Sequence, residues 1–135
     1  VILGPDATIA DALAYVRASD LSPALASQVY ITRPPLESPT GRFIGAAHFQ
    51  VLLREPPSTL VVEVVDQELE AIGPATPLGQ VARYFAIYNL VAVPVVDETD
   101  HLLGAVTVDD LLDHMLPEDW RELPEESDLA GDLNG

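Results

Sequence analysis

The feature that most constrains the fold of this 135-residue chain is an internal repeat. GPDATIADALAYVRASDL (residues 4–21) aligns with GPATPLGQVARYFAIYNL (73–90), and FIGAAHFQVLL (43–53) aligns with LLGAVTVDDLL (102–112). The offset between the copies shrinks from the first block to the second because the first copy carries a longer insert, ITRPPLESPTGR (31–42). Two copies of one small structural unit explain this pattern, since neighbouring repeats bury a shared core.

Each copy has the same order of predicted elements. An extended Gly-Pro segment leads into a helix in which apolar residues recur at helical spacing: Ile9, Ala12, Leu13 and Val16, then Leu78, Val81, Ala82 and Phe85. A strand, a turn, a short strand and a second helix follow. In the first copy the two strands are predicted at 28–32 and 42–46 and the helix at 49–54. In the second copy the strands are predicted at 90–97 and 101–106 and the helix at 108–115. The sequence therefore predicts an α/β (α+β) fold of two β-α-β-β-α repeats, at 1–67 and 68–120, with a polar and loosely ordered tail at 121–135.

The connection between the copies, PPSTLVVEVVDQELEAIGP (56–74), allows two interpretations of residues 60–65. The β-branched side chains of this segment fit a strand. Ser58 or Thr59 as a cap, with Glu63 in a capping box, fits a short helix instead. The repeat needs an extended segment near residues 69–72, which favours the helix for residues 60–65.

Charge and composition exclude several kinds of partner. The chain has 22 acidic residues against 6 basic ones, all arginine, so its field at a net charge of −16 repels nucleic acid and anionic membranes and attracts cations. The acidity could also serve solubility alone. The lack of cysteine excludes disulfides and thiolate metal sites. No apolar run approaches the roughly 20 residues that cross a bilayer, so we expect a soluble chain, and its start without methionine suggests a piece of a longer protein.

The second copy, VARYFAIYNLVAVPVVDETDHLLGAVTVDDLLDHM (81–115), resembles a cystathionine-β-synthase (CBS) repeat, and the two copies together resemble a tandem CBS pair. The run is especially similar to the cytosolic CBS region of MgtE-type magnesium transporters. This resemblance implies two repeats packed through their sheets into a pseudo-symmetric disc, which pairs with a second disc as a homodimer. It also implies a cytoplasmic location, a response to Mg²⁺, and a cleft that can bind ATP, ADP or AMP.

The resemblance points to Thr107 and Asp110 as nucleotide-binding residues, because CBS pairs that bind adenosine nucleotides often carry Thr or Ser three residues before Asp. The hydroxyl can donate to a phosphate oxygen, and the carboxylate can accept hydrogen bonds from ribose hydroxyls. The backbone near Ile72, Ala92 and Val93 would flank the base. The alternative is a helix cap, with Thr107 at the N-cap and Asp110 in the first turn.

The first copy departs from this pattern, since His48 stands in place of Thr107 and Val51 in place of Asp110. A valine cannot hold a ribose, so we expect the first cleft to be degenerate and at most one nucleotide to bind per chain. The second copy offers only two arginines for phosphate groups. AMP or adenosine would therefore suffer less from the acidic field than ATP.

Acidic side chains in the last part of the second copy are candidate Mg²⁺ ligands: Asp97, Asp109, Asp113, Glu118 and Asp119. Mg²⁺ prefers oxygen ligands and keeps much of its water, so one or two carboxylates can hold it. We expect such a site to be stronger where two acidic faces are pressed together in a dimer. For each of these residues the alternative is a solvated acidic face.

The motifs of common enzyme sites are missing from the sequence. It contains no paired histidines at zinc-enzyme spacing, no glycine-rich phosphate loop and no nucleophile motif, so we expect no enzyme. The favoured interpretation is a regulatory module that senses Mg²⁺, an adenine nucleotide or both. It would act on a membrane transporter domain absent from this chain or on another partner. A dimerisation module without ligand and the regulatory segment of a nucleotide-responsive enzyme remain as alternatives.

Overall fold

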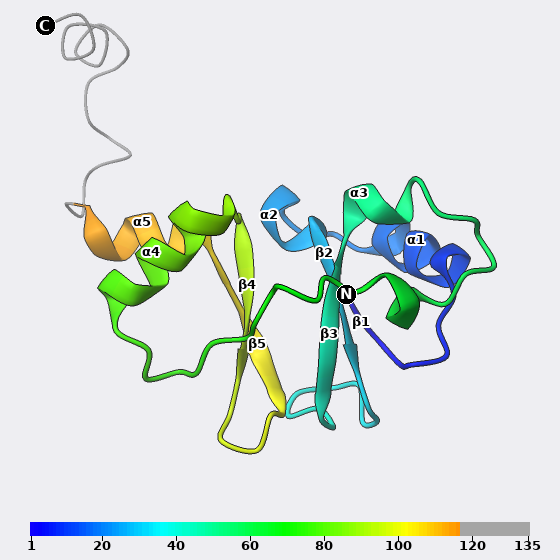
Figure 1. Cartoon of the computed structure of the whole chain (residues 1–135), viewed down its shortest axis with the longest axis horizontal. Helices are drawn as coiled ribbons and strands as arrows, with labels where there is room; N and C mark the ends of the chain where they lie inside the picture. The colour runs from blue at the N-terminus through cyan, green and yellow to red at the C-terminus, as the bar shows by residue number, and fades with distance from the viewer. Residues whose placement is uncertain (117–135) are drawn as a thin grey trace, which may run out of the picture.

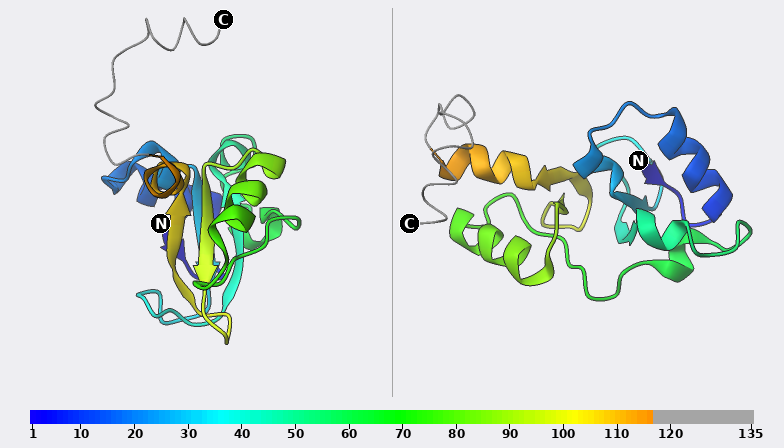
Figure 2. Two further views of the ribbon diagram at one scale, coloured as in Figure 1. Left: turned by 90° about the vertical axis from the view of Figure 1, so that its left-hand side faces the viewer. Right: turned by 90° about the horizontal axis from the view of Figure 1, so that it is seen from above.

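The computed structural model describes residues 1–116 and shows two halves side by side, with the strands in the middle and most helices toward the outer ends (Figure 1). The first half contains β1 (Ile2–Leu3), α1 (Ile9–Ala18), α2 (Pro23–Ala26), β2 (Gln28–Thr32), β3 (Phe43–His48) and α3 (Phe49–Leu52). After the 3-10 helix η1 (Val61–Val64), the second half contains α4 (Leu78–Tyr88), β4 (Ala92–Val96), β5 (Leu102–Thr107) and α5 (Val108–Met115). Seen from above, α4 and α5 lie at one end of the molecule and α1 at the other (Figure 2).

The strand pairings confirm the repeated β-α-β-β-α unit. In the first half, β1 pairs parallel with β2, and β2 pairs antiparallel with β3. In the second half, β4 pairs antiparallel with β5, and Ile72 takes the place of the first strand through a parallel bridge to Val95. The antiparallel pairs are both irregular near their far end, between Ile31 and Thr32 and between Val95 and Val96. The two sheets therefore share both the antiparallel strand pairing and the place at which its register shifts.

The buried apolar side chains form three clusters. One fills the first half beneath α1 and includes Ile9 and Ile31, and another fills the second half beneath α4 and α5 and includes Phe85. The third joins the halves, because Tyr30 and Ala46 of the first sheet belong to the same cluster as Val96 and Leu102 of the second. Burying each large apolar side chain contributes about 1.5–3 kcal/mol, so this middle cluster holds the halves together.

A second connection between the halves lies at the far end of the strands, where the loop 33–42 docks on the β4–β5 hairpin (Figure 1). The backbone N–H of Leu102 donates to Oγ1 of buried Thr40 at 3.0 Å, and Nδ1 of His101 donates to the Thr40 carbonyl. The backbone N–H of Phe43 donates to the Asp100 carbonyl at 2.7 Å. We call this loop and hairpin contact the inter-repeat clasp. The inter-repeat clasp holds the loop 33–42 of the first half against the β4–β5 hairpin of the second half.

Several boundaries differ from the sequence-based expectations. The strands predicted at 42–46 and 101–106 run instead over Phe43–His48 and Leu102–Thr107, and the helix predicted to reach residue 54 ends at Leu52. The predicted short helix near residues 60–65 is present as η1, but neither Ser58 nor Thr59 caps it. Its N-cap is Leu60, whose side chain has no polar atom, so the predicted capping box is wrong. Within residues 1–116 no helix is long and apolar enough to cross a membrane.

The two matched glycines of the repeat, Gly45 and Gly104, meet different surroundings. A Cβ on Gly45 would lie 3.1 Å from Cβ of Val65, whereas a Cβ on Gly104 would have no neighbour within 4 Å. We expect Gly45→Ala to lower the free energy of unfolding by about 1 kcal/mol through this overlap. Gly104→Ala is the matched control and should raise it by about 0.5 kcal/mol, because glycine is disfavoured in strands. Urea unfolding of both variants measures the difference, and equal effects would contradict the close packing at Gly45.

Candidate functional site

The two residues singled out in the second repeat, Thr107 and Asp110, lie where β5 runs into α5. Oγ1 of Thr107 accepts a hydrogen bond from the backbone N–H of Asp110 at 3.2 Å, and Oδ2 of Asp110 accepts one from the backbone N–H of Thr107 at 3.2 Å. Thr107 is buried and Asp110 is exposed. The pair therefore forms a reciprocal capping box. Each oxygen keeps a further lone pair toward solvent or a ligand.

The same capping box occurs at the start of α1, a helix with no predicted ligand site. There Oγ1 of Thr8 accepts from the backbone N–H of Asp11 at 3.1 Å, and Oδ2 of Asp11 accepts from the backbone N–H of Thr8 at 3.0 Å. The capping role predicted as the alternative is thus present at Thr107 and Asp110. The capping geometry alone does not distinguish a ligand site from a helix start.

The structure brings together most of the residues predicted around the nucleotide. Ala92 lies directly across from Thr107 in the β4–β5 register, and Val93 follows it along β4. Both residues are fully buried, backbone included, and the Ala92 carbonyl already accepts a hydrogen bond from Gln28. Ile72 lies beside Val95, three residues further along β4 from Ala92. A ligand at Thr107 would thus meet the start of β4 first and Ile72 only at a greater distance.

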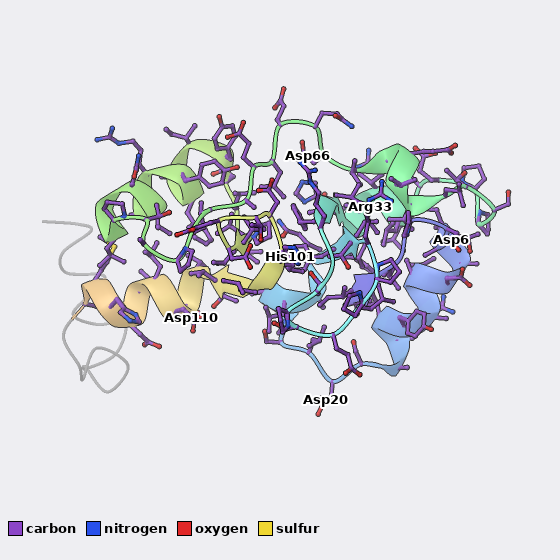
Figure 3. All side chains as sticks on the ribbon, turned by 90° about the horizontal axis from the view of Figure 1, so that it is seen from below. Asp6, Asp20, Arg33, Asp66, His101 and Asp110 are labelled. Atoms are coloured by element: carbon purple, nitrogen blue, oxygen red, sulfur yellow. The ribbon has the colours of Figure 1, made fainter. Side chains whose placement is uncertain are left out.

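A cavity of about 740 Å³ lies on the opposite side, where the two halves meet beside the end of β3. In the view from below, Asp66 and Asp110 stand on opposite sides of the molecule (Figure 3). The first half lines the cavity from α1, α2 and the β3–α3 corner, and the second half lines it from the end of α4 and the connection before Ile72. None of the five predicted nucleotide-binding residues lines it. The cavity therefore lies at the cleft that the sequence predicts to be degenerate.

The polar centre of this cavity is a pair formed by His48 and Asp66. Nε2 of His48 donates to Oδ2 of Asp66 at 2.7 Å, and the two side chains are 32% and 30% exposed. Oδ1 of Asp66 accepts from the backbone N–H of Glu68 at 2.9 Å, and the backbone N–H of Asp66 donates to the Ala46 carbonyl at 2.8 Å. The His48 hydrogen bond, aided by that of the Glu68 N–H, lowers the pKa of the Asp66 carboxyl. This carboxylate is therefore both ionised and oriented at neutral pH.

Sequence reasoning missed Asp66 because it lies in the connection between the repeats, 18 residues from His48. His48 itself is partly exposed, at the boundary between the interior and solvent. The single sequence signal for the pair is that His48 occupies the Thr107 position of the repeat, where a cap would be expected. Here it is the N-cap of α3 without a side-chain capping bond, so its ring is available to Asp66.

The floor of the cavity is rigid because a buried amide links the halves. Nε2 of Gln28 donates to the Ala92 carbonyl of the second half at 3.1 Å, and Oε1 of Gln28 accepts from the Tyr30 hydroxyl at 2.9 Å. Burial raises the pKa of Tyr30, so its hydroxyl remains a donor across the physiological range. At the rim, Asn89 ends α4 in the left-handed conformation at φ 51° and ψ 40°, which turns the chain toward β4.

The predicted metal ligands do not form one cluster. Asp97 lies at the hairpin end of β4, while Asp109 and Asp113 lie on α5, at the other end of β5. The backbone N–H of His101 lowers the pKa of the Asp97 carboxyl, whose Oδ1 also accepts from Thr99. Within residues 1–116 no three acidic or histidine side chains are placed to hold one metal ion. Glu118, Asp119 and the predicted tail at 121–135 lie outside the described residues.

Comparison with known proteins identifies the repeat. Residues 61–117 match the model of the CBS domain family. The magnesium transporter MgtE of Thermus thermophilus is 38% identical over 73 residues, which cover 54% of this chain and 16% of that protein. The chain thus spans about a sixth of the curated relative that it matches.

Solved structures extend the likeness to most of the chain. The cytosolic domain of the Mg²⁺ channel MgtE in complex with ATP has a TM-score of 0.72 and 30% sequence identity, covering 84% of this chain and 44% of that one. The cystathionine-β-synthase pair domain of a putative Mg²⁺ transporter from Shewanella oneidensis has a TM-score of 0.70 and 20% identity, covering 82% of this chain and 61% of that one. The second likeness shows the fold alone, and that fold is a CBS pair.

Proposed function

This chain has the fold of a CBS pair, with a CBS domain at residues 61–117, and we propose that it is a regulatory module that responds to Mg²⁺ and an adenine nucleotide and controls a transporter or another partner. The observation that carries the proposal is the 30% identity to an MgtE cytosolic domain whose structure was solved with ATP. The likeness to a magnesium transporter in sequence supports the same assignment.

The proposed nucleotide site of this function is the corner between β5 and α5. Asp110 presents an exposed carboxylate there, and Thr107 and Ala92 face each other across the β4–β5 pair. At the N-terminus of α5 the Val108 N–H donates to the Val91 carbonyl and the Asp110 N–H to Thr107, which leaves the Asp109 N–H for a phosphate oxygen. Asp109 and Asp110 in the first turn of α5 repel the negative charge of a polyphosphate. ATP is therefore expected to bind with Mg²⁺, which neutralises part of its charge.

The proposed response to Mg²⁺ is electrostatic and involves two copies of the chain. Asp109 and Asp113 are exposed on α5, Asp97 is partly exposed on the hairpin, and Glu118 and Asp119 follow in the sequence. Such carboxylates repel one another when two acidic faces approach, and bound Mg²⁺ removes that repulsion. A cation that binds one packing of a homodimer more tightly shifts the population toward it. This change in packing would be passed to the regulated partner in the cytoplasm.

Calorimetric titration of the 135-residue chain with Mg²⁺ and ATP tests this function. We expect Asp110→Asn to weaken ATP binding at least about tenfold, because a carboxylate that accepts ribose hydroxyls is lost. Asp11→Asn is the matched control, since Asp11 forms the same capping box on α1. It should leave ATP binding unchanged.

Melting temperature and sedimentation distinguish the response to Mg²⁺ from the binding of ATP. Millimolar Mg²⁺ should raise the melting temperature and shift sedimentation toward the dimer in the parent chain and in Asp110→Asn alike. ATP binding that survives Asp110→Asn would show that the nucleotide site is elsewhere. Absence of heat and of any melting shift with both ligands would overturn the sensor and support a ligand-free interaction module.

A further inference from the structure

We propose that the start of α4 is a docking surface for the segment that follows α5, residues 117–123, and that Trp120 of this segment packs against Leu78. The proposal concerns the packing of the second repeat and does not rest on the regulatory function above. It comes from a comparison of the two halves, because the surface that is open at α4 is covered at its counterpart, α1.

In the first half, the segment that follows α3 covers the start of α1. The backbone N–H of Ile9 donates to the Thr59 carbonyl at 2.8 Å. The backbone N–H of Ala10 donates to the Pro57 carbonyl at 3.0 Å. Val61 follows in the same segment and belongs to one core cluster with Ile9, and both side chains are 0% exposed. The segment therefore supplies hydrogen-bond acceptors and an apolar side chain to this helix start.

The matching start of α4 is open in the described part of the chain. Leu78 occupies the position of Ile9 in the repeat, but it is 42% exposed. The N-cap residue Pro77 makes no side-chain capping hydrogen bond. Among residues 1–116, no acceptor is paired with the backbone N–H of Leu78 or of Gly79. The start of α4 thus presents the same kinds of group that the first half covers.

The segment after α5 begins close to this surface. Helix α5 ends at the same outer end of the molecule at which α4 begins (Figure 1), and the two helices pack together through Val81 and Leu111. Packed helices lie about 8–10 Å apart between their axes. Residues 117–120 can span up to about 14 Å. The chain can therefore reach the start of α4 by the time it reaches Trp120.

The sequence after α5 repeats the apolar positions of the segment after α3. In the register that aligns the first residue of α5 with the first residue of α3, Trp120 aligns with Val61 and Leu123 with Val64. Val61 and Val64 are the residues of η1 that pack in the first core cluster. The chain's own continuation therefore fits the surface better than an unrelated partner does.

Charge supports the same occupant. Acidic side chains are favoured at a helix N-terminus, where the unpaired N–H groups carry partial positive charge. The first turn of α1 contains Asp11, whereas the first turn of α4 has no acidic residue. Glu118 and Asp119 directly precede Trp120 in the sequence. The docked segment would thus bring to α4 the negative charge that its own first turn lacks.

Fluorescence tests the contact directly, because Trp120 is the single tryptophan of the chain. We expect its emission to be blue-shifted and its quenching by acrylamide to be slower than in the urea-unfolded chain, since packing removes water from the ring. Leu78→Ser should shift the emission toward that of the unfolded chain and speed up quenching. Leu78→Met, which keeps an apolar side chain, should retain the blue shift.

Ile87→Ser is the matched control, because Ile87 is a 63% exposed apolar residue near the other end of the same helix. It should leave the emission of Trp120 unchanged. Far-ultraviolet circular dichroism should be the same for Leu78→Ser and the parent, which shows that the contact is lost without loss of the fold.

Three outcomes would overturn the proposal. The first is an emission of Trp120 in the folded parent chain equal to that of the unfolded chain. The second is a blue shift that persists in Leu78→Ser as it does in Ile87→Ser, which would place the ring against another surface. The third is a blue shift that disappears on dilution, which would show that Trp120 packs against a second copy of the chain.

Discussion

Leu102→Ala is expected to lower the free energy of unfolding by about 2–5 kcal/mol, the range for deleting a buried leucine side chain. Leu102 is 1% exposed and packs with Tyr30 and Ala46 of the other half as well as with Val96 on β4. Its backbone N–H is also part of the inter-repeat clasp. The cavity left by the alanine would therefore weaken the contact between the halves.

Leu103→Ala is the matched control, because Leu103 is the next residue of β5 and is 40% exposed. A change at such a position is expected to stay within about 1 kcal/mol. Guanidinium unfolding followed by circular dichroism and by tyrosine fluorescence measures both variants. A single transition seen by both probes shows that the halves unfold together. Equal losses for Leu102→Ala and Leu103→Ala would contradict the middle cluster.

Gly41→Ala is expected to lower the free energy of unfolding by about 1–3 kcal/mol or more, as overpacking does in a closed site. A Cβ on Gly41 would overlap the carbonyl oxygens of both Arg33 and Pro34. These are backbone atoms, so the overlap cannot be relieved by turning a side chain. The loop 33–42 would have to open, and with it the contact of Thr40 with the β4–β5 hairpin.

The matched control for Gly41→Ala is Gly79→Ala in the first turn of α4. A Cβ on Gly79 would have no neighbour within 4 Å, and alanine is favoured over glycine in a helix by up to about 1 kcal/mol. Gly79→Ala should therefore raise the melting temperature while Gly41→Ala lowers it, as measured by differential scanning calorimetry. A Gly41→Ala chain as stable as the parent would show that the loop does not hold its close turn.

The repeat allowed most of the fold to be predicted, because each element could be checked against its copy. The strand at 28–32 and the helix at 108–115 have the predicted bounds, β2 and α5. The short helix α2 was missed, although Ser22 as its cap and Pro23 at its first position are a recognisable start signal. The extended segment expected near 69–72 is reduced to Ile72, since its pairing with β4 depends on tertiary contact rather than local propensity.

The candidate sites were predictable only in part. Thr107 and Asp110 are three positions apart in the sequence, so their capping geometry follows from local sequence. His48 and Asp66 meet only through the fold, because the connection after α3 returns along β3 and bonds to the Ala46 carbonyl. A side chain placed by such a return has no spacing pattern in the sequence. The partner of a carboxylate in a connecting segment, such as Asp66, therefore becomes visible only in the structure.

The connection between the halves has a mechanical consequence. The backbone of Asp66 is bonded to Ala46 at 2.8 Å, and the backbone of Ile72 is bonded to Pro94 and Val96 at 2.9 Å each. The tether between these anchors is short and reaches at most about 20 Å at full extension. A molecule that displaces Asp66 would pull on β4 through the main chain itself. The main chain between Asp66 and Ile72 thus connects the cavity directly to the second sheet.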